Sequence, residues 1–252
     1  MRTTYTENEL PELLGLSGSR IITLVGAGGK TSLMNQLAAA FSELGYKTLL
    51  TTSTHIVRPE GLAGLLAVEE EDLGAVREAF RKTNLVGLGI PCASLAGNRT
   101  KWSSPSLEFL EEISDFADII LCEGDGSKRL PVKLPRDNEP VFCPGTDTVI
   151  GLVGLSCLGR KKEDILFGLA ESSHPDVSVI PDPIDIPFLL DLVQAPWGLK
   201  KGIRGEKFLA VFNQADLLNS AQSGCLSEGA QKIRDNGGLC RIVSLKNHMI
   251  IE

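Results

Sequence analysis

Residues 21–41 read IITLVGAGGKTSLMNQLAAAF. An apolar run of strand length, residues 21–25, leads into a glycine-rich turn, and a helical pattern follows over residues 32–41. Such a turn gathers backbone N–H groups and a helix N-terminus around one point, an arrangement that suits a phosphate. The turn also carries Lys30, a positive charge, and Thr31, a hydroxyl for a phosphate-bound Mg²⁺. The stretch therefore predicts a nucleoside triphosphate site.

The glycine-rich turn is shorter than the usual P-loop. The pattern G-x-x-x-x-G-K-[ST] would need a glycine at Leu24, whereas residues 26–31 form G-x-x-G-K-T. This short form resembles the ATP loop of the Mur ligase and folylpolyglutamate synthetase families. A dinucleotide fingerprint would need a third glycine at Thr31 and an acidic end to the second strand, which instead ends Thr-Thr-Ser-Thr-His at 51–55. A phosphate loop is favoured, and a purely structural turn with a surface lysine is the remaining alternative.

The composition is that of an acidic chain. It has 252 residues, of which 42% are hydrophobic, and a formal net charge of −7. This balance argues against nucleic acid or an anionic membrane as partner. The longest apolar runs have strand length, and the N-terminus lacks the apolar core of a signal peptide. The six cysteines form no C-x-x-C pair and no zinc pattern. We therefore expect a cytoplasmic protein with reduced thiols and with neither membrane nor nucleic acid as partner.

Strand-like and helical segments alternate along the chain. Strand-like runs stand at 21–25, 47–52, 84–90, 117–122, 148–155, 208–212 and 241–245, with helical patterns at 7–14, 32–44, 70–82, 105–116 and 226–235. A strand, a helix and a strand within about thirty residues form a βαβ unit with parallel pairing. The chain therefore predicts a doubly wound, mostly parallel α/β sheet of the P-loop NTPase type. We expect one domain over residues 1–252, with an N-terminal helical extension (1–16) and a less regular insertion (150–206).

A second loop with chemical groups follows the strand at 117–122. It reads Glu-Gly-Asp-Gly-Ser-Lys-Arg at residues 123–129. Because ligands of open α/β sheets bind beyond the carboxyl ends of strands, Glu123 and Asp125 are expected near the phosphate loop. A carboxylate there holds Mg²⁺ or orients an attacking water, and Lys128 is expected to face a phosphate. The alternative is an acidic surface turn.

The strand at 208–212 runs into Asn213-Gln214-Ala215-Asp216. This element resembles the N-K-x-D element of GTP-binding proteins, in which the aspartate accepts hydrogen bonds from the guanine ring edge. Residues 243–245, Val-Ser-Leu, are a candidate companion loop for the base. The alternative is that Asn213 and Asp216 cap the next helix. ATP and GTP both remain open.

Two further segments are candidates for the same edge of the sheet. Hydroxyls at the end of the second strand, Thr52 among them, are expected to contact the third phosphate or Mg²⁺, and His55 to meet a substrate. A β-rich threonine run is the plain alternative. In the loop expected over 96–104, Arg99 and Lys101 are candidates for transition-state charge, with solubility as the alternative.

Several motifs in order resemble the YqeC-type family of accessory proteins of selenium-dependent hydroxylases. They are the first loop with the threonine-rich strand end, residues 123–133 (EGDGSKRLPVK), 139–141, 146–151, 153–155, 198–202 and 213–216. Cys122, where a small or aliphatic residue is usual, and Gln214, in place of lysine, depart from the expected patterns. The resemblance implies a nucleotide-binding role in maturing selenium-containing molybdenum hydroxylases. It implies a molybdenum hydroxylase or its cofactor-assembly proteins as partners.

The sequence thus predicts a P-loop nucleoside triphosphatase that uses Mg²⁺ and ATP or GTP. The catalytic candidates are Lys30, Glu123 and Asp125, and the metal candidates are Thr31, Glu123 and Asp125. The nucleotide-binding candidates are Gly26, Ala27, Gly28, Gly29, Lys30, Thr31, Ser32, Thr52, Lys128, Asn213 and Asp216. Two alternatives remain: a ligase or kinase that activates a small carboxylate or selenium species, and a nucleotide-gated delivery or scaffold protein with little turnover.

Overall fold

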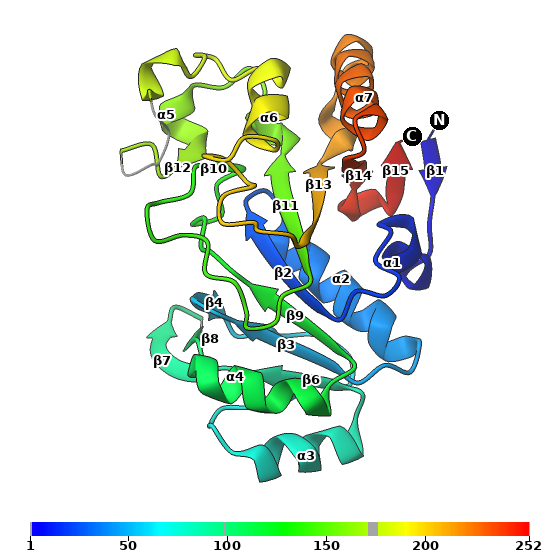
Figure 1. The fold of residues 1–252 in the computed structure, drawn as a ribbon, viewed down its shortest axis with the longest axis vertical. Helices are drawn as coiled ribbons and strands as arrows, with labels where there is room; N and C mark the ends of the chain where they lie inside the picture. The colour runs from blue at the N-terminus through cyan, green and yellow to red at the C-terminus, as the bar shows by residue number, and fades with distance from the viewer. Residues whose placement is uncertain (1, 98, 171–175, 252) are drawn as a thin grey trace.

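A ten-stranded sheet runs through the molecule (Figure 1). The structure is a computed structural model and describes residues 2–97, 99–170 and 176–251. In sheet order the strands are β1 (Arg2–Thr4), β15 (Met249–Ile251), β14 (Leu239–Ser244), β13 (Lys207–Asn213), β11 (Thr148–Gly154), β2 (Ile21–Gly26), β9 (Ile119–Glu123), β3 (Thr48–Thr52), β6 (Leu85–Leu88) and β5 (Leu66–Val68). The strands from β14 to β5 pair in parallel, whereas β15 and β1 extend the sheet antiparallel. The predicted mostly parallel α/β fold is confirmed.

Helices cover both faces of this sheet. One face carries α1 (Leu10–Leu13) and α2 (Lys30–Glu43), and the other carries α3 (Leu73–Lys82), α4 (Leu107–Ile113), α6 (Ile186–Leu192) and α7 (Ser220–Asp235). Successive strand residues point to opposite faces. Accordingly, Leu50 and Leu121 belong to the core under α2, and Leu49 and Ile120 to the core under α3 and α4. Because both faces are covered, β2 is buried along its whole length, which explains its unbroken apolar run.

Short helical turns complete the backbone. They are η1 (Glu7–Glu9), η2 (Ser114–Phe116), η3 (Leu155–Cys157), α5 (Lys162–Ile165), η4 (Val177–Val179), η5 (Ala215–Leu217) and η6 (Leu245–Asn247). In the part of the chain that the structure describes, no helix combines the length and hydropathy that a membrane span requires.

Two small sheets lie beside the large one. The first has the antiparallel order β4 (His55–Val57), β8 (Arg99–Ser103), β7 (Ile90–Leu95), and the second pairs β10 (Val132–Lys133) with β12 (Leu166–Phe167) in parallel. The prediction of a loop over residues 96–104 is therefore wrong for most of that range, because β8 occupies Arg99–Ser103. Trp102 on β8 is fully buried beside Gly89, and its Nε1 donates to Glu69 Oε1 at 2.8 Å. Burial of this large ring stabilises β8, although the polar neighbours of Trp102 give the segment only a weak strand pattern.

Other differences from the sequence expectations concern segment ends. The N-terminal extension is helical only in part, because β1 pairs with β15 before η1 and α1 begin. The boundary expected at residue 150 falls inside the central strand β11. Helix α7 begins at Ser220 rather than 226, because the side chain of Asn219 accepts from the Gln222 amide at 2.9 Å and Gln222 bonds back to it.

Candidate functional site

The carboxyl ends of the central strands meet at one edge of the sheet. Glu123 at the end of β9 pairs with Leu24 on one side and with Thr52 on the other. On the opposite flank of β2, Gly154 of β11 pairs with Asn213 of β13. The parallel arrangement thus brings the loops after β2, β9 and β13 together, as the sequence predicted.

The turn between β2 and α2 requires glycine. Gly26, Gly28 and Gly29 have φ angles of +90°, +80° and +129°. A Cβ on Gly28 would collide with the backbone of Gly154, and one on Gly29 with the side-chain amide of Asn213. The turn is therefore packed closely against the ends of β11 and β13, which fixes the path of its backbone.

The first two amides of this turn are already bonded. Gly26 N donates to both carboxylate oxygens of Asp125, at 3.0 and 3.1 Å, and Ala27 N donates to Leu152 O at 2.9 Å. The predicted anion site over residues 27–31 therefore narrows to the amides of 28–31. These amides lie at the N-terminus of α2, where N–H groups lack helical partners.

Lys30 belongs to a buried ionic network. Its Nζ lies 3.0 Å from Asp125 Oδ1 and donates to the carbonyl of Gly26, and the Lys30 and Asp125 side chains are 4% and 1% exposed. On the other side of Asp125, Lys133 Nζ lies 3.4 Å from Oδ2 and 2.8 Å from Glu139 Oε2. Both oxygens of Asp125 are therefore engaged, and this residue is the counter-ion of Lys30. The metal role that the sequence predicts for Asp125 would need one of these oxygens to exchange a partner, and it stays a prediction.

Burial and neighbouring charges together shift the pKa values of Lys30 and Glu123. Burial alone lowers the pKa of Lys30, but Asp125 and Glu123 outweigh it, so the pKa of Lys30 is raised. For Glu123, burial and then the neighbouring Asp125 raise the pKa against the opposing effect of Lys30. Lys30 is thus a stable cation at neutral pH. Glu123 is a carboxyl group whose charged form would be favoured by an additional cation.

Thr31 and Glu123 provide oxygen atoms that fit Mg²⁺. Thr31 Oγ1 donates to Glu123 Oε2 at 3.3 Å, and both residues line the same cavity. Hard oxygen donors suit Mg²⁺, which takes one or two protein ligands and completes its shell with phosphate and water. Among the described residues, no cluster of three or more His, Cys, Asp or Glu could hold a metal. An ion at this position would therefore depend on the nucleotide.

Asn213 connects the phosphate loop to its neighbours. Its Nδ2 donates to Gly28 O at 2.9 Å, and its Oδ1 accepts from Leu245 N at 3.1 Å and from Gln214 N at 2.7 Å. Asn213 thus positions the loop instead of capping a helix, and the N-cap of α7 is Asn219. The helix-cap alternative is wrong.

Asp216 lies at the surface beside the loop that the sequence named as its companion. Its Oδ1 accepts from Ser244 Oγ at 2.6 Å, which orients the carboxylate. Gln214, at the position of the expected lysine, has a left-handed backbone with φ +72°, and its Oε1 accepts from Ser156 N at 3.1 Å. Its side chain is therefore held toward the end of β11.

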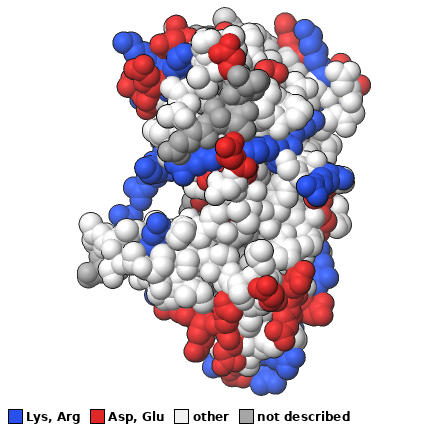
Figure 2. All heavy atoms as spheres, turned by 60° about the vertical axis from the view of Figure 1, so that its left-hand side comes forward, with Lys and Arg blue, Asp and Glu red and all other residues white. Residues whose placement is uncertain are grey.

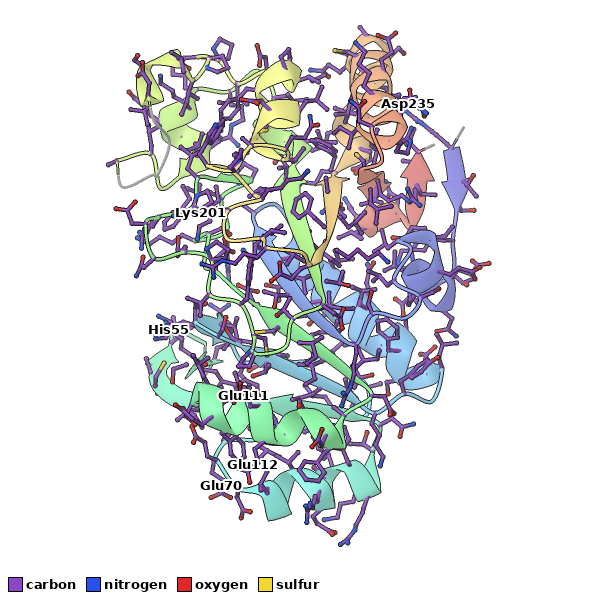
Figure 3. All side chains as sticks on the ribbon, in the orientation of Figure 1. His55, Glu70, Glu111, Glu112, Lys201 and Asp235 are labelled. Atoms are coloured by element: carbon purple, nitrogen blue, oxygen red, sulfur yellow. The ribbon has the colours of Figure 1, made fainter. Side chains whose placement is uncertain are left out.

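The remaining predicted residues divide into two groups. Ser32 and Lys128 line the cavity, and so do His55, which Figure 3 labels beside β4, and Lys101. Thr52 lies behind the cavity wall, where its fully buried hydroxyl donates to the carbonyl of Glu123 at 2.9 Å. Direct contact between Thr52 and a nucleotide therefore stays a prediction. In the structure Thr52 supports the backbone of Glu123. Arg99 does not line the cavity.

The cavity measures about 960 Å³ and is more cationic than the protein as a whole. Its lining includes seven Lys or Arg side chains and four Asp or Glu side chains, in a chain of net charge −7. Figure 2 shows basic side chains along a hollow on this side, and acidic ones gathered at the lower end of the molecule. Figure 3 labels Glu70, Glu111 and Glu112 at that lower end. The cavity lining also includes Arg58, Arg136 and Arg160, which were not predicted because they come from separate segments and share no local pattern.

Comparisons with known proteins give a family match. The family model described as "YqeC protein" matches residues 22–169, more than half of the chain. A curated relative from Escherichia coli K12, "Uncharacterized protein YqeC", is 27% identical over 202 residues, which is 78% of this chain and 77% of that protein. Among solved structures, HypB from Helicobacter pylori in complex with nickel is 11% identical, with 96% of this chain and 86% of that chain covered. Its TM-score of 0.37 is too low to transfer any property.

Proposed function

This chain belongs to the YqeC family, and from its site geometry we propose that it binds and hydrolyses a nucleoside triphosphate with Mg²⁺. The observation that carries the proposal is the closely packed glycine turn, whose Lys30 and Thr31 line one cavity together with Glu123 from the end of β9. Backbone amides, a lysine and a hydroxyl paired with a carboxylate are the groups that triphosphate chemistry requires.

Each group has a defined role in this proposal. The amides of residues 28–31 bind the β-phosphate, and Lys30 exchanges part of its contact with Asp125 for oxygens of the β- and γ-phosphates. Thr31 and Glu123 would hold Mg²⁺, which neutralises charge on the phosphate oxygens when bound. Glu123 also lies where it can orient an attacking water. Fixed electrostatic groups therefore account for most of the catalysis.

Removal of the Lys30 ammonium tests this assignment. We expect Lys30→Ala and Lys30→Met to lower nucleotide-dependent phosphate release by about 100-fold or more, the order of loss seen for a single transition-state donor. The methionine variant preserves side-chain volume, and circular dichroism verifies folding of both variants. Lys47→Ala, which removes an exposed lysine at the opposite end of the sheet, serves as the control. Wild-type rates in both Lys30 variants would refute the proposal.

We also propose that guanine is the preferred base. Support comes from Asp216, whose carboxylate is oriented by Ser244 and is exposed beside the loop after β14. A carboxylate that accepts two ring-edge hydrogen bonds discriminates strongly, because a mismatched base leaves polar groups unpaired. Asp216→Asn should weaken GTP binding at least about tenfold and leave ATP binding within about twofold. Equal effects on both nucleotides, measured by calorimetry, would assign Asp216 no role in base selection.

The resemblance of the ordered motifs supports a role in maturing selenium-dependent molybdenum hydroxylases. On this proposal the protein contacts a molybdenum hydroxylase or its cofactor-assembly proteins, and the affinity changes with the bound nucleotide. A pull-down of the hydroxylase that gives equal recovery with GTP, with GDP and without nucleotide would contradict it.

A further inference from the structure

A group of cations in the cavity is not used by the proposed nucleotide chemistry. We call Lys128, Arg129 and Arg160 the outer cations; all three are exposed and line the cavity. Pockets for one small molecule occupy roughly 300–1,000 Å³. The cavity, at about 960 Å³, lies at the upper end of that range and has room beyond a triphosphate. The sequence placed Lys128 against a phosphate, but its ammonium lies over the ring of Phe167 on β12, 5.6 Å from the ring centroid.

The backbone that carries two of the outer cations is strained. Lys128 and Arg129 have φ angles of +48° and +64°, and Leu130 N closes the turn on Ser127 O at 2.9 Å. Two successive positive φ angles describe a turn of type I′, in which Gly and Asn are the usual residues. Long basic side chains are unfavourable there, and strain of this kind concentrates at functional sites. The turn is held in a shape that presents two cations to the cavity.

A buried path connects this turn to the phosphate loop. Asp125 contacts Lys30 on one side and Lys133 on the other, and Lys133 Nζ lies 5.3 Å from the centroid of the Phe167 ring. Lys128 contacts the same ring. Movement of Lys30 toward a phosphate would therefore change the charge balance around Asp125 and, through Lys133, the wall that carries the outer cations.

We propose that the outer cations form a second anion site, which binds the phosphate or carboxylate group of a small co-substrate beside the nucleotide. The excess of positive charge in the cavity of an acidic protein favours entry of such an anion. Glu60, Glu139 and Asp164 also line the cavity, and Glu139 is paired with Lys133. The inference rests on the proposed function and narrows it to nucleotide chemistry with a second, anionic substrate.

Calorimetric titrations of the full-length protein test this inference. With the phosphate loop saturated by Mg²⁺ and a non-hydrolysable GTP analogue, inorganic phosphate and succinate serve as separate probes of the two anion chemistries. Lys128→Ala, Arg129→Ala and Arg160→Ala should each weaken the bound probe by about tenfold while the nucleotide Kd stays within about twofold. Lys161→Ala, an exposed cation next to Arg160 but outside the cavity lining, should change neither affinity.

The possible results separate this inference from the proposed function. Absence of binding by both probes, or affinities that the three substitutions leave unchanged, would overturn the second site. Equal weakening of nucleotide and probe would also overturn it, because the cations would then belong to the nucleotide site. If wild type binds no nucleoside triphosphate but still binds the probe, and Lys128→Ala weakens that binding, the proposed function fails and the anion site stands.

Discussion

Asp125 holds two buried ammonium groups at once. Its carboxylate lies 3.0 Å from Lys30 Nζ and 3.4 Å from Lys133 Nζ, and it accepts two contacts from the Gly26 amide. A buried ion pair contributes little net stability, but removal of one partner leaves an uncompensated charge. The residue therefore contributes to both the shape and the charge state of the phosphate loop.

Asp125→Asn should be strongly destabilising. We expect a loss of about 3–5 kcal/mol in the free energy of unfolding, because Lys30 loses its nearest counter-ion in a buried position. Urea denaturation measures this loss. Asp115→Asn, at an exposed position, is the matched control and should stay within about 0.5 kcal/mol of wild type. A similarly small effect of Asp125→Asn would show that the network does not support the loop.

Tyr5 should give the fold a pH dependence in the alkaline range. Burial, followed by the nearby Glu7, raises the pKa of Tyr5 from 10.0 to about 12. The phenol of the unfolded chain ionises first as the pH rises. The contribution of Tyr5 to stability is therefore complete below pH 10 and is lost as the pH rises toward about 12.

Tyr5→Phe should remove this dependence. The Tyr5 hydroxyl has no hydrogen-bond partner among the described residues, so its removal should change stability at pH 8 by no more than about 1 kcal/mol. In urea denaturation at pH 8 and pH 11, wild type should lose more stability than Tyr5→Phe over this interval. Parallel losses in the two proteins would exclude Tyr5 as the source.

At the scale of elements, the strand–turn–helix unit around the phosphate loop depends on packing as well as on backbone freedom. Gly28 and Gly45 both have positive φ angles, +80° and +91°. A Cβ on Gly28 would collide with Gly154, whereas one on Gly45 would meet no atom within 4 Å. The two positions therefore separate steric collision from backbone strain.

Gly28→Ala should cost more stability than Gly45→Ala and should abolish nucleotide binding. Backbone strain accounts for about 1–2 kcal/mol in both variants, and the collision with β11 adds to it only at Gly28. Chemical denaturation and calorimetric titration of GTP measure the two effects. Equal costs, or normal nucleotide binding by Gly28→Ala, would contradict the packing that we describe.

Local patterns predicted the elements that carry the phosphate loop. The apolar run of β2, the glycine turn and the start of α2 lie together in sequence, so periodicity and turn chemistry identify them. The capping box of Asn219 and Gln222 is a local signal that the sequence prediction overlooked, and the start of α7 was therefore placed too late. By contrast, β1 pairs with β15 at the other end of the described chain, which no local pattern reveals. The strands β8 and β15 pair with their neighbours β7 and β14, but they are too short for a clear alternation of polar and apolar residues.

The candidate site was likewise predictable only where local motifs and strand ends define it. Glu123 was placed near the phosphate loop because parallel strands end at one edge of a sheet. The role of Asp125 as counter-ion of Lys30 was missed, since it depends on Lys133 and on the path of the loop. Arg160 reaches the cavity only through the tertiary fold. Contacts of this kind follow from packing and have no sequence signature.

At the scale of the whole molecule, the charge is unevenly distributed. Acidic side chains gather at the end formed by α3 and α4, whereas the cavity beside the phosphate loop has an excess of Lys and Arg (Figures 1 and 2). Net charge alone indicated only that nucleic acid is an improbable partner. An excess of positive charge in the cavity favours the approach of small anions, as the proposed nucleotide and anionic co-substrate require.

The most direct test is the stability of the protein with and without Mg²⁺ and GTP. At a free nucleotide concentration 100 times the Kd, the free energy of unfolding of wild type should rise by about 2.7 kcal/mol. The Lys30→Met variant should gain nothing at the same concentration, and wild type should gain less when EDTA replaces Mg²⁺. Equal stabilisation of both proteins, or none of wild type by any nucleoside triphosphate, would contradict the proposed phosphate site.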